Sequence, residues 1–143
     1  MNKNLIASST ISINSTPLQI WDVLTNPEKV KVYLYGTKVK TDWIKGNPIS
    51  FEGQYEGKKY HDKGIIIDNQ PLKTLTYSYW SSFSGLEDNT ENYAIISYKI
   101  EEKEKGMYNF TWHQQGFASE EGKCHTEQGL IAMLQEIKKL AEE

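Results

Sequence analysis

The sequence contains no arginine, and all 16 of its basic residues are lysine. Arginine makes rigid two-pronged contacts to carboxylate and phosphate groups, so its absence argues against an arginine-clamped acidic substrate or a phosphoryl-transfer site. A genome biased toward lysine gives the same composition and is the simpler explanation. The formal net charge of -3 provides no basic surface, so no nucleic-acid partner is expected.

Cysteine and long apolar runs are also scarce. Cys124 is the single cysteine, which excludes an internal disulfide. Serine and threonine interrupt the apolar residues of the first thirteen positions, and no stretch approaches the ~20 apolar residues of a membrane span. A chain of 143 residues is long enough for one domain with a sizeable core. We therefore expect a single cytoplasmic domain over residues 1–143.

The residues that most often carry catalysis or bind metals are few. His61, His113 and His125 do not have the spacing of metal ligands, so neither a zinc site nor another cofactor is expected. Cys124 precedes His125 directly, and a thiol beside an imidazole can act as a nucleophile. Adjacent residues on a helix point about 100° apart, however, so this pair is badly placed to share a proton. We predict no catalytic residue and no metal site.

Aromatic residues are abundant between residues 49 and 117, where they alternate with polar ones. Alternation at a period of two is typical of antiparallel strands that bury one face. After a first strand over residues 5–13, the pattern predicts further strands at 39–43, 49–55, 60–67, 75–80, 93–100 and 108–114. A polar loop over residues 81–92 interrupts this series.

Three helices are predicted around these strands. Thr16-Pro17 and Asn26-Pro27 each combine a capping residue with a proline suited to the first helical position, which indicates two short helices in tandem. A long helix over about residues 119–141 carries apolar residues at three- and four-residue spacing. Consecutive antiparallel strands with helices segregated to one side define an α+β fold with about six or seven strands.

Several short motifs follow one another in a familiar order. They are Ile20-Trp21, Asn26-Pro27-Glu28-Lys29, Asp42-Trp43 with Gly46, Asp62-Lys63-Gly64, Pro71 to Leu75, Gly85 through Glu91-Asn92-Tyr93, Gly116-Phe117, and Gly129 to Lys138. Together they resemble the START-like (SRPBCC, birch-pollen-allergen) superfamily. The most similar branch is the heat-shock protein 90 ATPase activator homologues, single-domain proteins similar to that activator's C-terminal domain.

The resemblance implies a helix-grip fold, in which a curved antiparallel sheet wraps round the long C-terminal helix and two short helices close one end. It also implies an apolar cavity between sheet and helix, which members of the superfamily use for lipids, polyketides or hormones. Two departures from the family pattern bear on that cavity. Gly129 is followed by Leu130 rather than by tryptophan, and Gln114 stands where the family often has histidine. His113, one residue earlier, belongs to the opposite face of its strand.

The alternation also sorts side chains onto faces. Four sets are expected to face the long helix: Ile49, Phe51 and Tyr55; Leu75, Tyr77 and Tyr79; Ile96, Tyr98 and Ile100; and Phe110, Trp112 and Gln114. Several of these side chains end in polar groups, which need a partner when buried and would suit a mostly apolar pocket. A filled aromatic core is the alternative. The predicted ligand-binding residues are Trp43, Phe51, Tyr77, Tyr79, Tyr98, Trp112 and Gln114.

Gly129 lies inside the predicted long helix, where glycine costs roughly 1 kcal/mol relative to alanine. Either it makes room for a ligand or a bulky sheet residue, or it allows close packing of helix on sheet.

The function expected from the aromatic inner face and the resemblance is the binding of a small hydrophobic molecule or lipid. A co-chaperone-like module that binds a heat-shock ATPase is the alternative. A cavity enzyme is a third reading, for which no acid or base is identified on the inner face.

Overall fold

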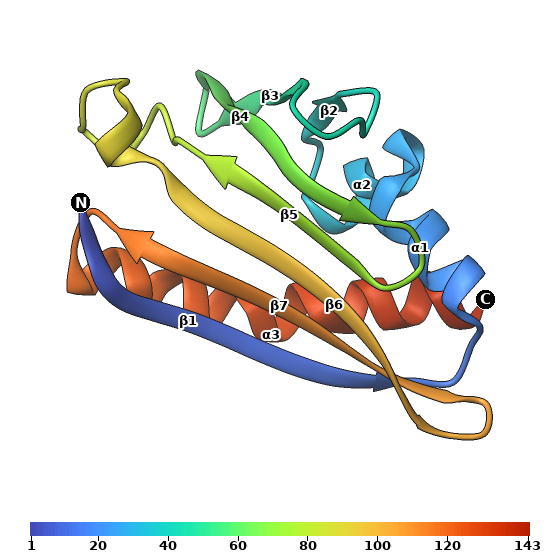
Figure 1. The fold of residues 1–143 in the computed structure, drawn as a ribbon. Coiled ribbons are helices and arrows are strands. Elements are labelled where there is room, and N and C mark those ends of the chain that lie inside the picture. The colour runs from blue at the N-terminus through green and yellow to red at the C-terminus, as the bar shows by residue number, and fades with distance from the viewer.

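A computed structural model describes residues 1–143 as a seven-stranded antiparallel sheet that curves round one long helix (Figure 1). The strands are β1 (Asn2–Ile13), β2 (Lys38–Lys40), β3 (Pro48–Tyr55), β4 (Lys58–Gln70), β5 (Thr74–Tyr79), β6 (Ala94–Glu104) and β7 (Met107–Phe117). The helices are α1 (Pro17–Thr25), α2 (Pro27–Tyr33) and α3 (Glu120–Glu142), with a short 3-10 turn η1 (Thr90–Asn92) between β5 and β6.

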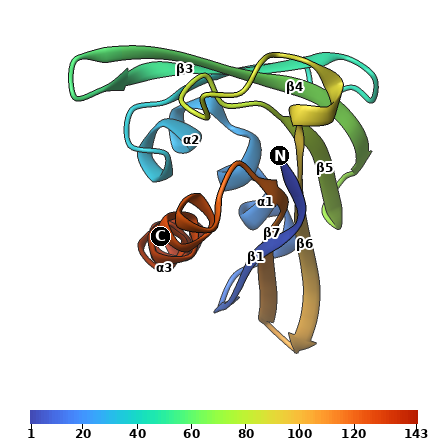
Figure 2. The same ribbon diagram turned by 90° about the vertical axis from the view of Figure 1, so that its left-hand side faces the viewer.

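The strands lie in the order β1-β7-β6-β5-β4-β3-β2. The end-on view in Figure 2 shows the sheet bent so that β3 and β4 lie across the interior from α3. Side chains from the concave face, from α1 and α2 and from one side of α3 form a single apolar core. The predicted α+β helix-grip fold is confirmed.

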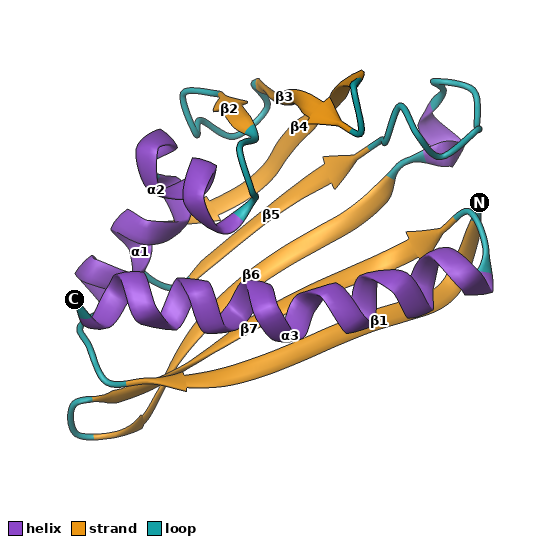
Figure 3. Cartoon of the chain, turned by 180° about the vertical axis from the view of Figure 1, so that it is seen from behind, coloured by secondary structure: helices purple, strands orange, loops and turns teal.

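The two short helices begin at the predicted caps. The Thr16 side chain accepts a hydrogen bond from the backbone N–H of Gln19 at 3.2 Å, and the Asn26 side chain accepts one from Glu28 at 3.1 Å. A proline follows each cap in the first turn, where its missing N–H has no cost. Both helices lie beside the C-terminal end of α3 (Figure 3).

The long helix α3 packs on β1 and β7, and all of its buried residues lie in its second half. Its buried residues are Leu130, Met133, Leu134, Ile137 and Ala141, and none of residues 120–129 is buried. The first half begins at Ser119, whose hydroxyl accepts a hydrogen bond from the Gly122 N–H at 3.1 Å. Local capping therefore supports the first half, and core packing supports the second.

The predicted strand over residues 39–43 is too long, because β2 ends at Lys40. Asp42 ends it by folding the chain back: its carboxylate accepts hydrogen bonds from the Ile44 N–H at 2.9 Å and from the Asn47 side chain at 2.7 Å. Such local side-chain bonds compete with strand pairing. Trp43 consequently has a positive φ of 64°.

The three consecutive isoleucines of β4 alternate between the two faces of the sheet. Ile66 is fully buried, whereas Ile65 and Ile67 are 50% and 39% exposed on the outer face. Gly64 lies so close to β5 that a Cβ there would stand 1.6 Å from the Ser78 carbonyl oxygen, so only glycine fits. No helix in the chain combines the length and the apolar character needed to cross a membrane.

Candidate functional site

The middle of the concave face holds tyrosines whose hydroxyl groups bond to the protein itself. The Tyr77 and Tyr98 hydroxyls are 2.7 Å apart, and their rings meet edge to face with centroids 5.6 Å apart. Tyr33 of α2 donates to the Leu24 carbonyl at 3.0 Å. Burial raises the pKa of Tyr33 and of Tyr77 well above the usual value. These phenols are therefore neutral, and their polar ends have protein partners.

A second cluster lies toward the β3 side of the interior, around Asp62 of β4. Tyr79 donates a hydrogen bond to Asp62 Oδ2 at 2.5 Å, while the backbone N–H and hydroxyl of Ser82 donate to Oδ1 at 2.9 and 3.0 Å. Phe51 pairs with Asp62 across β3 and β4, and its ring meets that of Tyr79 edge-on at 5.7 Å. Burial first, and then the Asp62 carboxylate, raise the pKa of Tyr79.

Asp62 is the residue that sequence reasoning missed. It is only 6% exposed and shares the inner face of β4 with Gly64 and Ile66. Alternation at a period of two from Ile66 through Gly64 predicts an inward position for Asp62. The three consecutive isoleucines at 65–67 do not show which of them faces inward.

The concave face also contains Trp112 and Gln114 of β7, which are 7% and 9% exposed. Gln114 donates a hydrogen bond to the Gly116 carbonyl at 3.0 Å. Gln114 Oε1 has no hydrogen-bond partner. The fully buried side-chain atoms that lack a partner are Asn69 Oδ1 and Asn89 Oδ1, so Gln114 Oε1 keeps some solvent exposure. His113 is half-buried on the other face, as predicted from the one-residue offset.

Trp43 lies partly buried against the core from the loop after β2. Its carbonyl accepts a hydrogen bond from the Asn69 side chain at 2.8 Å. A positive φ is rare for a bulky residue and persists only where its surroundings enforce it. The bonds of Asp42 on one side and Asn69 on the other supply that constraint.

One flank of the first half of α3 is only partly covered: Gly122 and Thr126 are half-buried, and Gly129 is exposed. At about 100° per residue, Gly122 and Gly129 point to the same side of the helix as Met133, with Thr126 beside them. A methyl group added at Gly129 would meet nothing within 4 Å. The close-packing interpretation of Gly129 is therefore wrong. The interpretation that it makes room remains a prediction.

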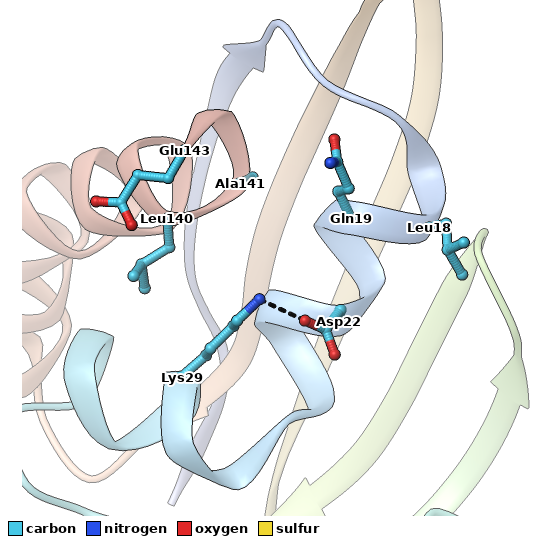
Figure 4. A pocket seen from close by; sticks show the side chains of 7 residues that line it. All are labelled: Leu18, Gln19, Asp22, Lys29, Leu140, Ala141 and Glu143. Atoms are coloured by element: carbon cyan, nitrogen blue, oxygen red, sulfur yellow. Dashed lines mark hydrogen bonds and ion pairs between the residues drawn. The ribbon is translucent and has the colours of Figure 1, made fainter.

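Two hollows mark the surface at the two ends of α3. One of about 320 Å³ is lined by Leu18, Gln19, Asp22, Lys29, Leu140, Ala141 and Glu143 (Figure 4). The other, of about 480 Å³, is lined by Ser119, Glu121, Gly122, Cys124, His125 and Gln128. None of the seven predicted ligand-binding residues lines either hollow. No group of three His, Cys, Asp or Glu side chains is placed to hold a metal ion.

The loop between β5 and β6 is fastened on both faces of β4. On the inner face Asp62 holds Ser82. On the outer face Lys63 forms an ion pair with Asp88 at 2.5 Å, and Asp88 also accepts a hydrogen bond from Tyr93. Asp88, which remains partly exposed, therefore helps to anchor this loop.

The chain belongs to the family of Activator of Hsp90 ATPase homolog 1-like proteins, whose family model matches residues 14–142. The START-like resemblance is thereby confirmed. Protein ChR145 from Cytophaga hutchinsonii has a similar solution structure, at 34% identity and a TM-score of 0.81 over 99% of this chain and 97% of that one.

Two further solved structures share the fold at lower identity. The Aha1 dimer from Colwellia psychrerythraea is 15% identical, with a TM-score of 0.73 over 96% of both chains. PFC0360w, an HSP90 activator from Plasmodium falciparum, is 11% identical, with a TM-score of 0.74 over 95% of both chains. A search of curated proteins finds no match.

Proposed function

We propose that this protein binds a small apolar or aromatic molecule between the concave face of the sheet and the first half of α3. The observation that carries the proposal is the partly covered flank of that half-helix. None of residues 120–129 is buried, and a side chain at Gly129 would enter open space. Small residues at Gly122, Thr126 and Gly129 keep the flank low, which suits a ligand lying against it.

The side chains expected to contact the ligand are those that keep some exposure on the concave face. Trp112 offers an aromatic surface, and Gln114 Oε1 offers an unbonded acceptor. Pockets for small molecules combine an apolar lining with a few such polar groups. Tyr77 and Tyr98 form a hydrogen bond to each other and are expected to line the sheet side of the proposed site. Trp43, Phe51 and Tyr79 complete the predicted lining.

A fluorescent apolar probe, N-phenyl-naphthylamine, tests this proposal. We expect saturable binding to the wild-type protein. Gly129→Leu should weaken that binding at least tenfold, because its side chain fills the proposed site. Gly129→Ala is the matched control and should bind within about twofold of wild type. Unsaturable binding, or equal binding by Gly129→Leu, would refute the proposal. Native mass spectrometry of the purified protein would reveal a retained lipid.

A chaperone partner is the second candidate function, and a patch on the outer face favours it. Ile65 and Ile67 of β4 are 50% and 39% exposed, and Ile44, 58% exposed, lies in the loop whose Gly46 and Asn47 bond to Ile66. This patch of Ile44, Ile65 and Ile67 is apolar, as interaction surfaces commonly are. The family description and the name of the Plasmodium relative suggest a heat-shock ATPase as its partner.

The patch is tested by pull-down and ATPase assays with heat-shock protein 90 from the same organism. The double variant Ile65→Ser, Ile67→Ser should lose retention and any stimulation. Ile131→Ser, at a residue 66% exposed on α3, is the control and should retain both. If the wild-type protein is neither retained nor stimulatory, this second function is rejected.

A further inference from the structure

Asp62 is a buried carboxylate that pairs with no cation. It is 6% exposed, and none of the ion pairs in the structure includes it. Removing a carboxylate from water is costly unless hydrogen bonds or an opposite charge compensate. Its compensation comes from neutral donors alone: Tyr79, and the N–H and hydroxyl of Ser82.

The two carboxylate oxygens are not equally occupied. Oδ1 accepts both bonds from Ser82, whereas Oδ2 accepts only the one from Tyr79. An ionised carboxylate has about four acceptor positions, so Oδ2 keeps one for a further donor.

Two aromatic residues are neighbours of Asp62. Phe51 is the direct cross-strand neighbour of Asp62, and Tyr79 carries the hydroxyl that bonds to Oδ2. The two rings meet edge-on with centroids 5.7 Å apart. Ring edges and faces attract an aromatic guest, and the faces also attract a cation. The combination of an aromatic wall with one anionic acceptor fits a ligand that has an aromatic body and a positively charged end.

We infer that Asp62 determines the specificity of the proposed site by selecting aromatic ligands that carry an ammonium group. The ammonium group donates to Oδ2, and the aromatic body lies against Phe51 and Tyr79. This inference rests on the proposed function, since it names the class of ligand that the same interior takes. It goes further in assigning the discriminating role to one residue.

The structural alternative is that Asp62 only fastens the loop through Ser82. The two roles separate experimentally, because Ser82→Ala weakens the fastening and leaves the charge, whereas Asp62→Asn removes the charge and keeps an acceptor oxygen. A purely structural Asp62 makes both variants less stable without changing which ligands bind.

The test compares three probes with one aromatic body: naphthylmethylamine, methylnaphthalene and naphthoate. Their affinities are measured by displacement of N-phenyl-naphthylamine. We expect the amine to bind about 10- to 100-fold more tightly than the neutral probe, as for a hydrogen bond to a charged group, and naphthoate to bind weakest. Asp62→Asn should abolish this preference and leave methylnaphthalene affinity unchanged. Ser82→Ala should keep the preference.

Each other outcome has a distinct meaning. Equal binding of all three probes by the wild-type protein overturns the role of Asp62 and leaves the proposed function standing. Binding of none overturns both. Should Asp62→Asn fail to fold, the carboxyl carbon resonance of Asp62 in the wild-type protein decides the question. It must move on titration with the amine and stay fixed with methylnaphthalene; any other result overturns the inference.

Discussion

The two halves of α3 have the same regular backbone but different relations to the rest of the molecule. The second half buries Leu130, Leu134 and Ile137 to 2% exposure or less, beside α1, α2 and the sheet. The first half buries no residue and is supported by its cap and by the Lys123–Glu127 ion pair at 2.9 Å. Packing of the second half thus positions a first half in which only Gly122, Lys123 and Thr126 are half-buried. This flank is the one that we propose as a ligand site.

Truncation in the packed half should give the largest effect. Leu134→Ala removes a side chain that is 1% exposed, and we expect a loss of about 2–5 kcal/mol in the free energy of unfolding. Thr126→Ala, on the unpacked half, should change it by less than about 0.5 kcal/mol. Denaturant titration measures both. Similar losses from the two variants would erase the contrast between the halves.

The next largest effect is expected at alkaline pH, which should lower the free energy of unfolding. Burial holds the pKa of Tyr33 and of Tyr77 well above the value of about 10 that tyrosine has in the unfolded chain. Above pH ~10 the unfolded chain therefore releases protons that the folded protein retains. Stability is fully present below this pH and falls by about 1.4 kcal/mol per buried tyrosine for each further pH unit.

Thermal unfolding between pH ~8 and ~11 measures this loss, and Tyr77→Phe should reduce the slope of the decline. Ultraviolet titration of the folded protein provides the check. If all nine tyrosines ionise together in the folded state, Tyr33 and Tyr77 are accessible to solvent, and this prediction is contradicted.

The smallest effect is expected at Gly129, on the unpacked half. Alanine there should stabilise the protein by up to about 1 kcal/mol, because the helix gains propensity and the methyl group meets nothing within 4 Å. Gly64→Ala, where a Cβ would collide with the Ser78 carbonyl, is the contrasting variant and should be strongly destabilising. A loss of stability in Gly129→Ala would mean that the flank is packed after all.

The fold was predictable from the sequence because its signals are local and repeated. Proline after a capping residue placed α1 and α2, and alternation placed Trp112 and Gln114 on the inner face. The burial of α3 follows the same kind of signal, because its apolar stripe and its buried residues both begin at Leu130.

The site was predictable only in part. The sequence pattern predicts that the strand continues through Trp43, whereas Asp42 ends it earlier by accepting hydrogen bonds from the Ile44 N–H and the Asn47 side chain. The inward position of Asp62 is not evident from the isoleucine run that follows it, and its hydrogen-bond partner Ser82 lies 20 residues away in the sequence. Contacts between distant segments decide such positions, and periodicity does not report them.

The central claim is that the flank of the first half of α3 is a ligand site, and a backbone amide NMR titration with N-phenyl-naphthylamine tests it most directly. We predict saturable shifts concentrated at Gly122, Thr126, Gly129 and Gln114, with Ile65 and Ile67 unmoved. Shifts confined to the outer patch of Ile44, Ile65 and Ile67, or shifts that never saturate, would contradict the claim.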